Sequence, residues 1–149
     1  MTKLIHPAAG AVAVLMITIF WLSTVLSELF GTEAAVIAVK RAIPLGFSVL
    51  IPALAVAGGS GFALAKGRRG GLIGTKIKRM PIIAANGILV LVPSALFLAY
   101  KAKHAEMDSI FYAVQVLELL AGALNITLLS LNMRDGLKLG RGRLGHRST

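Results

Sequence analysis

The sequence predicts an all-α membrane protein with four transmembrane helices. Its 149 residues are 56% hydrophobic and only 15% charged, and its mean hydropathy of +0.81 exceeds that of soluble domains. A window of about 19 residues finds four apolar runs long enough to cross ~30 Å of hydrocarbon. Because the connections between these runs are short, we expect one domain, residues 1–149, folded as an up-down antiparallel four-helix bundle.

The four runs define the expected spans in order along the chain. They cover about residues 7–27, 43–65, 81–100 and 110–133. The first run carries no charge and is longer than the apolar core of a signal peptide, so we expect this helix to be retained.

Prolines mark both the starts and the interiors of these spans. Pro7, Pro44 and Pro81 stand where three helices are expected to begin, a position at which the missing N–H costs nothing. In the second and third spans, Pro52 and Pro93 each follow a glycine by six residues. Proline inside a helix frees a carbonyl one turn earlier, so these two residues predict kinked helices.

The basic residues orient the predicted bundle. Most of them fall on one side: Lys3, Lys66, Arg68, Arg69, Lys76, Lys78, Arg79, Arg134, Lys138, Arg141, Arg143 and Arg147. The opposite side receives only Lys40, Arg41, Lys101 and Lys103. The positive-inside rule therefore predicts cytoplasmic termini in a bacterial inner membrane, with residues 134–149 as a basic cytoplasmic tail.

The fourth span contains a carboxylate, Glu118, within the apolar segment "QVLELLAGALN". It lies ~13 Å from the outer end of its helix, where an unpaired charge costs several kcal/mol. Gln115, Gly122, Asn125 and Asn132 share its helix face and complete a polar stripe, which we expect to face the bundle interior. Possible partners on other spans are Ser23, Thr24 and Asn86, and the depth of Asn86 matches Asn125 better than Glu118.

Two interpretations of this polar interior stay open. In one, Glu118 is protonated and clamps helices together by hydrogen bonding. In the other, it changes protonation or binds a cation during transport or electron transfer. The small residues Ala57 with Gly61 and Ala55 with Gly59 permit close helix packing, either within one chain or in a homo-oligomer.

Histidine suggests a redox alternative. His6 opens the first span and His104 ends the third, so the two lie a full membrane apart and cannot ligate one haem in a single chain. In a symmetric dimer, His6 and its copy could hold haem b between two chains. A membrane subunit that binds haem b or quinone is therefore the alternative function.

The outer connection offers a possible metal site. His104, Glu106 and Asp108 alternate there, and Glu28 ends the first span on the same side. Histidine and carboxylates are ligands for divalent cations. The neighbouring lysines could instead pair with these acids.

The inner connection, "GRRGGLIGTKIKR", predicts contact with anionic lipid headgroups rather than nucleotide binding. It lacks the Gly-Lys-Ser/Thr order of a P-loop, and no strand precedes it. Its basic residues, expected to meet the headgroups, are Arg68, Arg69, Lys76, Lys78 and Arg79.

Other chemistries find little support in the sequence. The chain has no cysteine, which excludes disulfides, thiolate metal sites and cysteine nucleophiles. The basic residues sit in short pieces rather than on a folded module, which argues against nucleic-acid binding. No enzyme signature is present. We therefore expect a non-enzymatic protein whose interior around Glu118 binds or conducts a small ion or proton, or couples to a larger membrane complex. A purely structural subunit of such a complex is a further alternative.

Overall fold

The computed structural model describes residues 2–64 and 71–145, and its elements are all helical. They are α1 (Thr2–Phe30), α2 (Glu33–Leu64), α3 (Gly71–Asn86), the π-helical turn η1 (Gly87–Leu91), α4 (Val92–Lys103) and α5 (Ser109–Gly145). The side chains of residues 2, 3, 71–73, 76, 77 and 139–145 lie outside this description. Four helical stretches are long and apolar enough to cross a membrane: Leu4–Phe30, Glu33–Leu64, Lys78–Lys103 and Ser109–Lys138. The prediction of an all-helical protein with four such helices is therefore confirmed.

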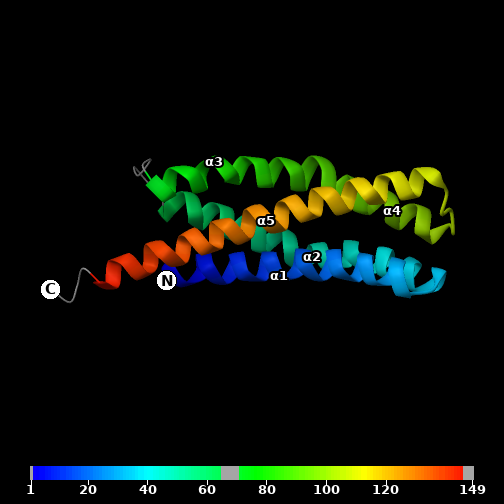
Figure 1. Ribbon diagram of the computed structural model, residues 1–149, viewed down its shortest axis with the longest axis horizontal. Coiled ribbons are helices and arrows are strands. Elements are labelled where there is room, and N and C mark those ends of the chain that lie inside the picture. The colour runs from blue at the N-terminus through cyan, green and yellow to red at the C-terminus, as the bar shows by residue number, and fades with distance from the viewer. Residues whose placement is uncertain (1, 65–70, 146–149) are drawn as a thin grey trace.

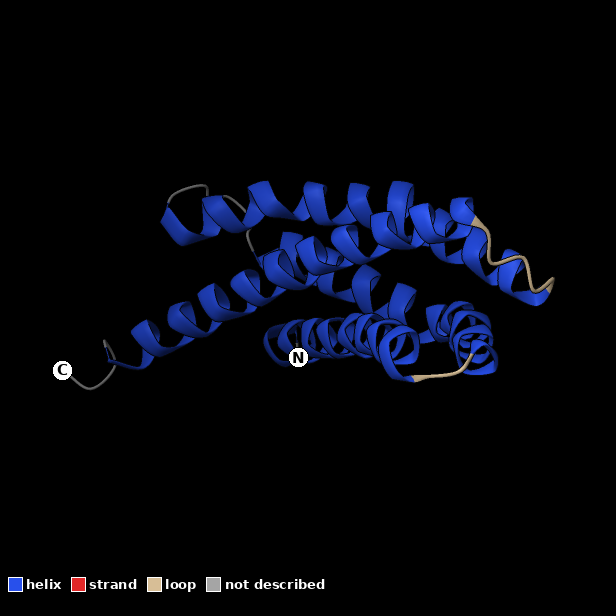
Figure 2. Cartoon of the chain, turned by 45° about the vertical axis from the view of Figure 1, so that its right-hand side comes forward, coloured by secondary structure: helices blue, strands red, loops and turns tan. Residues whose placement is uncertain are grey.

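The helices form an elongated bundle (Figure 1). The first turn of α1, the last turns of α2 and α5 and the start of α3 lie at one end, which we call the termini end. The connections at residues 31–32 and 104–108 lie at the other, which we call the distal end. Helix α1 packs against α2 and α5, α3 packs against α5, and α4 packs against α2 and α5. Figure 2 shows α5 crossing the bundle obliquely rather than running parallel to α1.

The prolines expected at helix starts lie inside helices instead. Pro7 is in α1, Pro44 in α2 and Pro81 in α3. Helix α2 begins ten residues before the expected position, after Thr32, whose hydroxyl accepts the backbone N–H of Ala35 at 3.3 Å. This capping interaction satisfies a free N–H of the first turn and is a stronger start signal than proline. The expectation was wrong because a hydropathy window finds apolar runs, not helix ends.

The third span is interrupted where a kink was predicted. Gly87–Leu91 forms a π-helical turn, closed by the backbone N–H of Val92 donating to the carbonyl of Gly87. The turn lies just before Pro93, which has no N–H to continue an α-helical pattern. In contrast, α2 continues as one α-helix through both Pro44 and Pro52.

Two clusters of buried apolar side chains hold the bundle together. The distal cluster joins α2, α4 and α5 through Val36, Leu98, Ala102 and Phe111. The other cluster joins α1 and α2 through Ala13, Ile17 and Leu50. Many large apolar side chains instead point outward, among them Leu15, Ile88, Leu89 and Leu120. Such an apolar exterior suits lipid contact rather than water.

The small residues of α2 serve two different surfaces. Ala57 is buried, and a Cβ added at Gly61 would lie 2.6 Å from Met80 Cε and 3.1 Å from His6 Cε1. Ala57 and Gly61 therefore allow close packing between helices of the same chain. Ala55 and Gly59 face outward instead. Ala55 is exposed, and a Cβ added at Gly59 would meet nothing within 4 Å.

Candidate functional site in the bundle interior

An ion pair between α2 and α5 lies inside the bundle. Lys40 Nζ donates to Glu118 Oε2 at 2.5 Å, and their side chains are only 1% and 12% exposed. Lys40 Nζ also lies 3.4 Å from the hydroxyl oxygen of Thr24 on α1, which accepts a hydrogen bond from it. The site thus joins three helices through a single ammonium group.

The helix positions explain why these side chains meet. Lys40 is seven residues into α2 and Glu118 nine residues into α5, which places them about 10 Å and 13 Å along their helices from the distal end. Lys40 was expected in the outer connection, and that expectation was wrong because α2 already begins at Glu33. Glu118 therefore has a basic partner that compensates its charge, in place of the neutral partners considered from the sequence.

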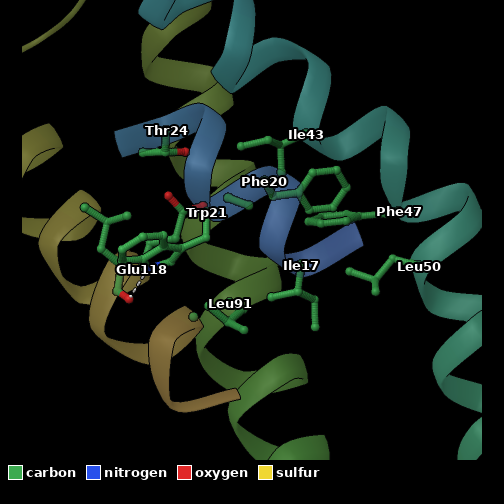
Figure 3. Close-up of a pocket in the computed structure, with 12 residues that line it drawn as sticks. Ile17, Phe20, Trp21, Thr24, Ile43, Phe47, Leu50, Leu91 and Glu118 are labelled. Atoms are coloured by element: carbon green, nitrogen blue, oxygen red, sulfur yellow. Dashed lines mark hydrogen bonds between the residues drawn. The ribbon is translucent and has the colours of Figure 1, made fainter. Parts of the chain in front are cut away.

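A small cavity adjoins the carboxylate of Glu118. It holds about 60 Å³, enough for more than one water molecule. Its walls are largely apolar, with side chains such as Ile17, Phe47 and Leu91, while Thr24 and Glu118 add polar groups (Figure 3). This space is partly open and largely apolar, and it lies beside one member of the ion pair.

Trp21 forms one wall of this cavity, beside Glu118 (Figure 3). Its indole N–H donates to the carbonyl of Leu119 at 2.9 Å. A Cβ at Gly122 would lie 3.0 Å from Trp21 Cδ1, so this glycine makes room for the ring. Tryptophans near a span end commonly anchor the membrane interface, but here the indole joins α1 to α5 inside the bundle.

A second polar contact lies nearer the termini end. Asn86 Nδ2 donates to Asn125 Oδ1 at 2.9 Å and to the carbonyl of Ala121 at 2.8 Å. Asn125 Nδ2 in turn donates to the carbonyl of Ile83 at 3.4 Å. The expected contact between Asn86 and Asn125 is therefore present, and it fixes α3 against α5.

The remaining polar residues of the α5 stripe are also buried. Gln115 is 5% exposed and Asn132 is 6% exposed. Among the described residues, neither Gln115 Oε1 nor Asn132 Oδ1 has a hydrogen-bond partner. Buried acceptor oxygens without a donor are uncommon and call for an explanation.

The termini end carries a second interhelical ion pair. Arg79 Nη1 lies 2.8 Å from Asp135 Oδ2, and Asp135 is buried. Arg134 adds a longer contact of 3.5 Å to the same carboxylate. Asp135 was expected within a tail, but α5 continues through it to Gly145.

The residues expected at lipid headgroups are only partly described. Arg68, Arg69 and the side chain of Lys76 lie outside the described residues. Lys78 is exposed. Arg79 is half-buried and engaged with Asp135, so it acts as a link between α3 and α5.

His6 joins α1 to the end of α2. Its Nδ1 lies 3.0 Å from the carbonyl oxygen of Ala57 and 3.1 Å from Ser60 Oγ. A hydrogen bond from Nδ1–H to the carbonyl places the imidazole lone pair on Nε2. His104 is at the distal end, where its Nδ1 lies 2.8 Å from the carbonyl oxygen of Tyr100.

The distal connection does not assemble the possible metal site considered from the sequence. Among the described residues, no three His, Asp or Glu side chains gather as a metal site would need, so His104, Glu106, Asp108 and Glu28 do not form one. The acids pair with Lys101 instead, whose Nζ lies 3.4 Å from Glu106 Oε2 and 2.6 Å from Asp108 Oδ2. This pairing was the alternative considered from the sequence.

Asp108 also begins α5. Its Oδ1 accepts the backbone N–H of Phe111 at 2.9 Å, as an N-terminal capping residue does. The hydrogen bond from Lys101, followed by that from Phe111, holds the pKa of Asp108 below its ordinary value.

Comparisons with known proteins do not identify a relative. No family model, no curated protein and no solved structure matches the chain.

Proposed function

We propose that this protein binds and passes a small cation, the proton included, through its interior at the Lys40–Glu118 pair. The single observation that carries this proposal is the burial of that pair within two helices able to span a membrane. Intramembrane ionisable residues commonly mark ion pathways, because keeping charge there is expensive. A proton or cation that binds Glu118 would release Lys40, so the pair can exist in two states.

We also propose an up-down antiparallel arrangement in a bacterial inner membrane, with both termini cytoplasmic. The charge distribution supports this orientation more strongly once the helix ends are known. Lys40 is an interior residue and Arg41 lies within α2, which leaves Lys101 and Lys103 as the basic residues near the distal end outside α2. The termini end retains the basic connection and the basic C-terminal residues.

The test is a flux measurement in sealed proteoliposomes that contain either a pH-sensitive or a sodium-sensitive dye, with a potassium diffusion potential as the driving force. The wild type is compared with the double variant Lys40→Gln/Glu118→Gln, which removes both charges and leaves no unpaired one. We expect flux in the wild type and its loss in the double variant. Equal flux through both, or no flux above protein-free liposomes, would contradict the proposal and make the pair a structural clamp.

A redox subunit is the second candidate, and the geometry of His6 supports it. The Nδ1 contact with the carbonyl of Ala57 is the kind of interaction that orients an imidazole for metal ligation through Nε2. Visible absorption of the purified protein, oxidised and then reduced, tests this function. A haem spectrum lost in His6→Ala would support it, whereas a colourless protein from haem-supplied cells would contradict haem binding.

A further inference from the structure

A polar pocket opens at the distal end of the bundle. It has a volume of about 460 Å³ and lies among the end of α1, the start of α2 and the segment from Ala105 to Tyr112. Its lining includes the carboxylates of Glu28 and Glu33 together with the hydroxyl-bearing Ser27 and Thr32, but no Lys, Arg or His. A pocket with two carboxylates and no basic residue concentrates cations.

Glu28 connects this pocket to the interior ion pair. Its Oε1 is buried and has no hydrogen-bond partner among the described residues. It lies one helical turn from Thr24, which contacts Lys40.

A second unpartnered oxygen lies on the facing helix. Gln115 is 95% buried, and its Oε1 has no donor within the described part of the chain. It precedes Glu118 by one turn of α5, on the side towards the distal end. Two unpartnered acceptor oxygens therefore lie on the distal side of the interior site, Glu28 one turn from Thr24 on α1 and Gln115 one turn from Glu118 on α5.

The acidic side chains at this end of the bundle interior outnumber the basic one. Glu118 is already paired with Lys40, whereas Glu28 Oε1 has no hydrogen-bond partner among the described residues. The Glu28 carboxylate is therefore available to one proton or one monovalent cation. A divalent ion needs more carboxylates, and no cluster of three His, Asp or Glu side chains exists in the described residues.

We propose that the distal pocket is the entrance of the cation path and that Glu28 is its first binding group, receiving a small monovalent cation, the proton included. This inference rests on the proposed function and specifies where that function begins. The cation binds at the Glu28 carboxylate, one turn of α1 from the Thr24 hydroxyl that accepts a hydrogen bond from Lys40.

Trp21 provides a direct readout of binding. It is the only tryptophan of the chain, and it lies beside Glu118 (Figure 3). Its fluorescence in detergent is recorded while NaCl replaces a bulky organic chloride at constant pH, and separately while pH is lowered at constant salt. Isothermal titration with NaCl gives a second measurement. The variants are Glu28→Gln, the conservative Glu28→Asp, and the control Glu106→Gln, which removes an exposed carboxylate of the distal connection that does not line the pocket.

We expect saturable binding in the wild type to sodium, to protons or to both, and the two titrations distinguish these cations. Glu28→Gln should weaken binding by about tenfold or more, since it removes a charge-assisted contact. Glu106→Gln should bind like the wild type, and Glu28→Asp should retain part of the affinity. The inference would be overturned if Glu28→Gln bound the cation as tightly as the wild type does. It would also be overturned if neither method detected binding by the wild-type protein.

Flux measurements separate this inference from the function on which it rests. Flux in the wild type that persists in Glu28→Gln overturns the entrance at Glu28 and leaves the transport function standing. Binding that requires Glu28 without any flux supports the site and contradicts transport. Melting of each variant in detergent verifies that it is folded before either result is read.

Discussion

Lys40 and Glu118 stand 78 positions apart in the chain, yet their side chains meet at 2.5 Å inside the bundle. The contact fixes α2 to α5 by charge, and Thr24 ties α1 to the same ammonium group. Replacing Glu118 with Gln or Leu leaves the Lys40 charge unpaired, which in buried sites costs about 3–5 kcal/mol. We expect both single variants to unfold at lower denaturant in a detergent titration followed by circular dichroism, with Glu118→Leu the more damaged because it also loses hydrogen bonding.

Replacing Lys40 and Glu118 together avoids the cost of an unpaired buried charge. Replacing a buried pair with apolar residues of similar size is often neutral or stabilising. We therefore expect Lys40→Met/Glu118→Leu to recover most of the stability lost in Glu118→Leu. A double variant no more stable than the single one would show that Lys40 stabilises the fold through contacts other than Glu118.

The contact between Asn86 and Asn125 should contribute modestly to stability. Interhelical hydrogen bonds in membranes average about 0.6 kcal/mol and reach about 1.7 kcal/mol. A double-mutant cycle with Asn86→Ala and Asn125→Ala, followed by denaturant unfolding in detergent, measures this coupling. A coupling energy near zero would mean that the carbonyl groups of Ala121 and Ile83 are the effective partners.

Gly46 should tolerate no side chain, because a Cβ built there meets the ring of Phe20. Overpacking of this kind costs about 1–3 kcal/mol. Gly46→Val should therefore destabilise the protein, as measured by thermal unfolding in detergent. Gly58→Val on the same helix is the matched control, because a Cβ there meets nothing within 4 Å. Equal losses in both variants would assign the effect to helix propensity instead of packing.

Acid should loosen the start of α5 through Asp108. Its pKa is lower in the folded protein than in the unfolded chain, so its contribution is complete above the unfolded value of about 3.9. That contribution is lost as pH falls through the lowered folded value. Asp108→Asn should flatten the dependence of melting temperature on pH in this acidic window. An unchanged pH profile in the variant would mean that other carboxylates control acid unfolding.

The sequence allowed the membrane helices to be predicted because apolar run length is a local property. The depth of Asn86 and Asn125 was equally readable, since both lie inside uninterrupted apolar runs. Lys40 was missed for a physical reason: a window of hydropathy stops at a charged residue, whether that residue faces water or an opposite charge. Thr32 followed by Glu33 was the available signal, because that pattern caps a helix that must then carry Lys40 inward.

Side-chain contacts between different helices could not be predicted from the sequence. Asp135 and Arg79 each look solvated when read alone, and only the crossing of α3 and α5 brings them together. Trp21 lies near the outer end of its predicted span, a position typical of tryptophans at the membrane interface. Its actual partner, the carbonyl of Leu119, is a backbone group that no side-chain pattern reveals.

The π-helical turn at Gly87–Leu91 rotates the side-chain faces of the third span relative to those of a continuous α-helix. Each residue turns an α-helix by roughly 100°, and a wider turn shifts the register of everything that follows it. Before the turn, Asn86 faces α5; after it, Leu98 and Ala102 join the cluster that includes Val36 of α2. The segment thereby contacts α5 on both sides of the turn and gains α2 as a second neighbour beyond it. A helical wheel drawn across its whole length would assign the wrong face to the residues beyond Leu91.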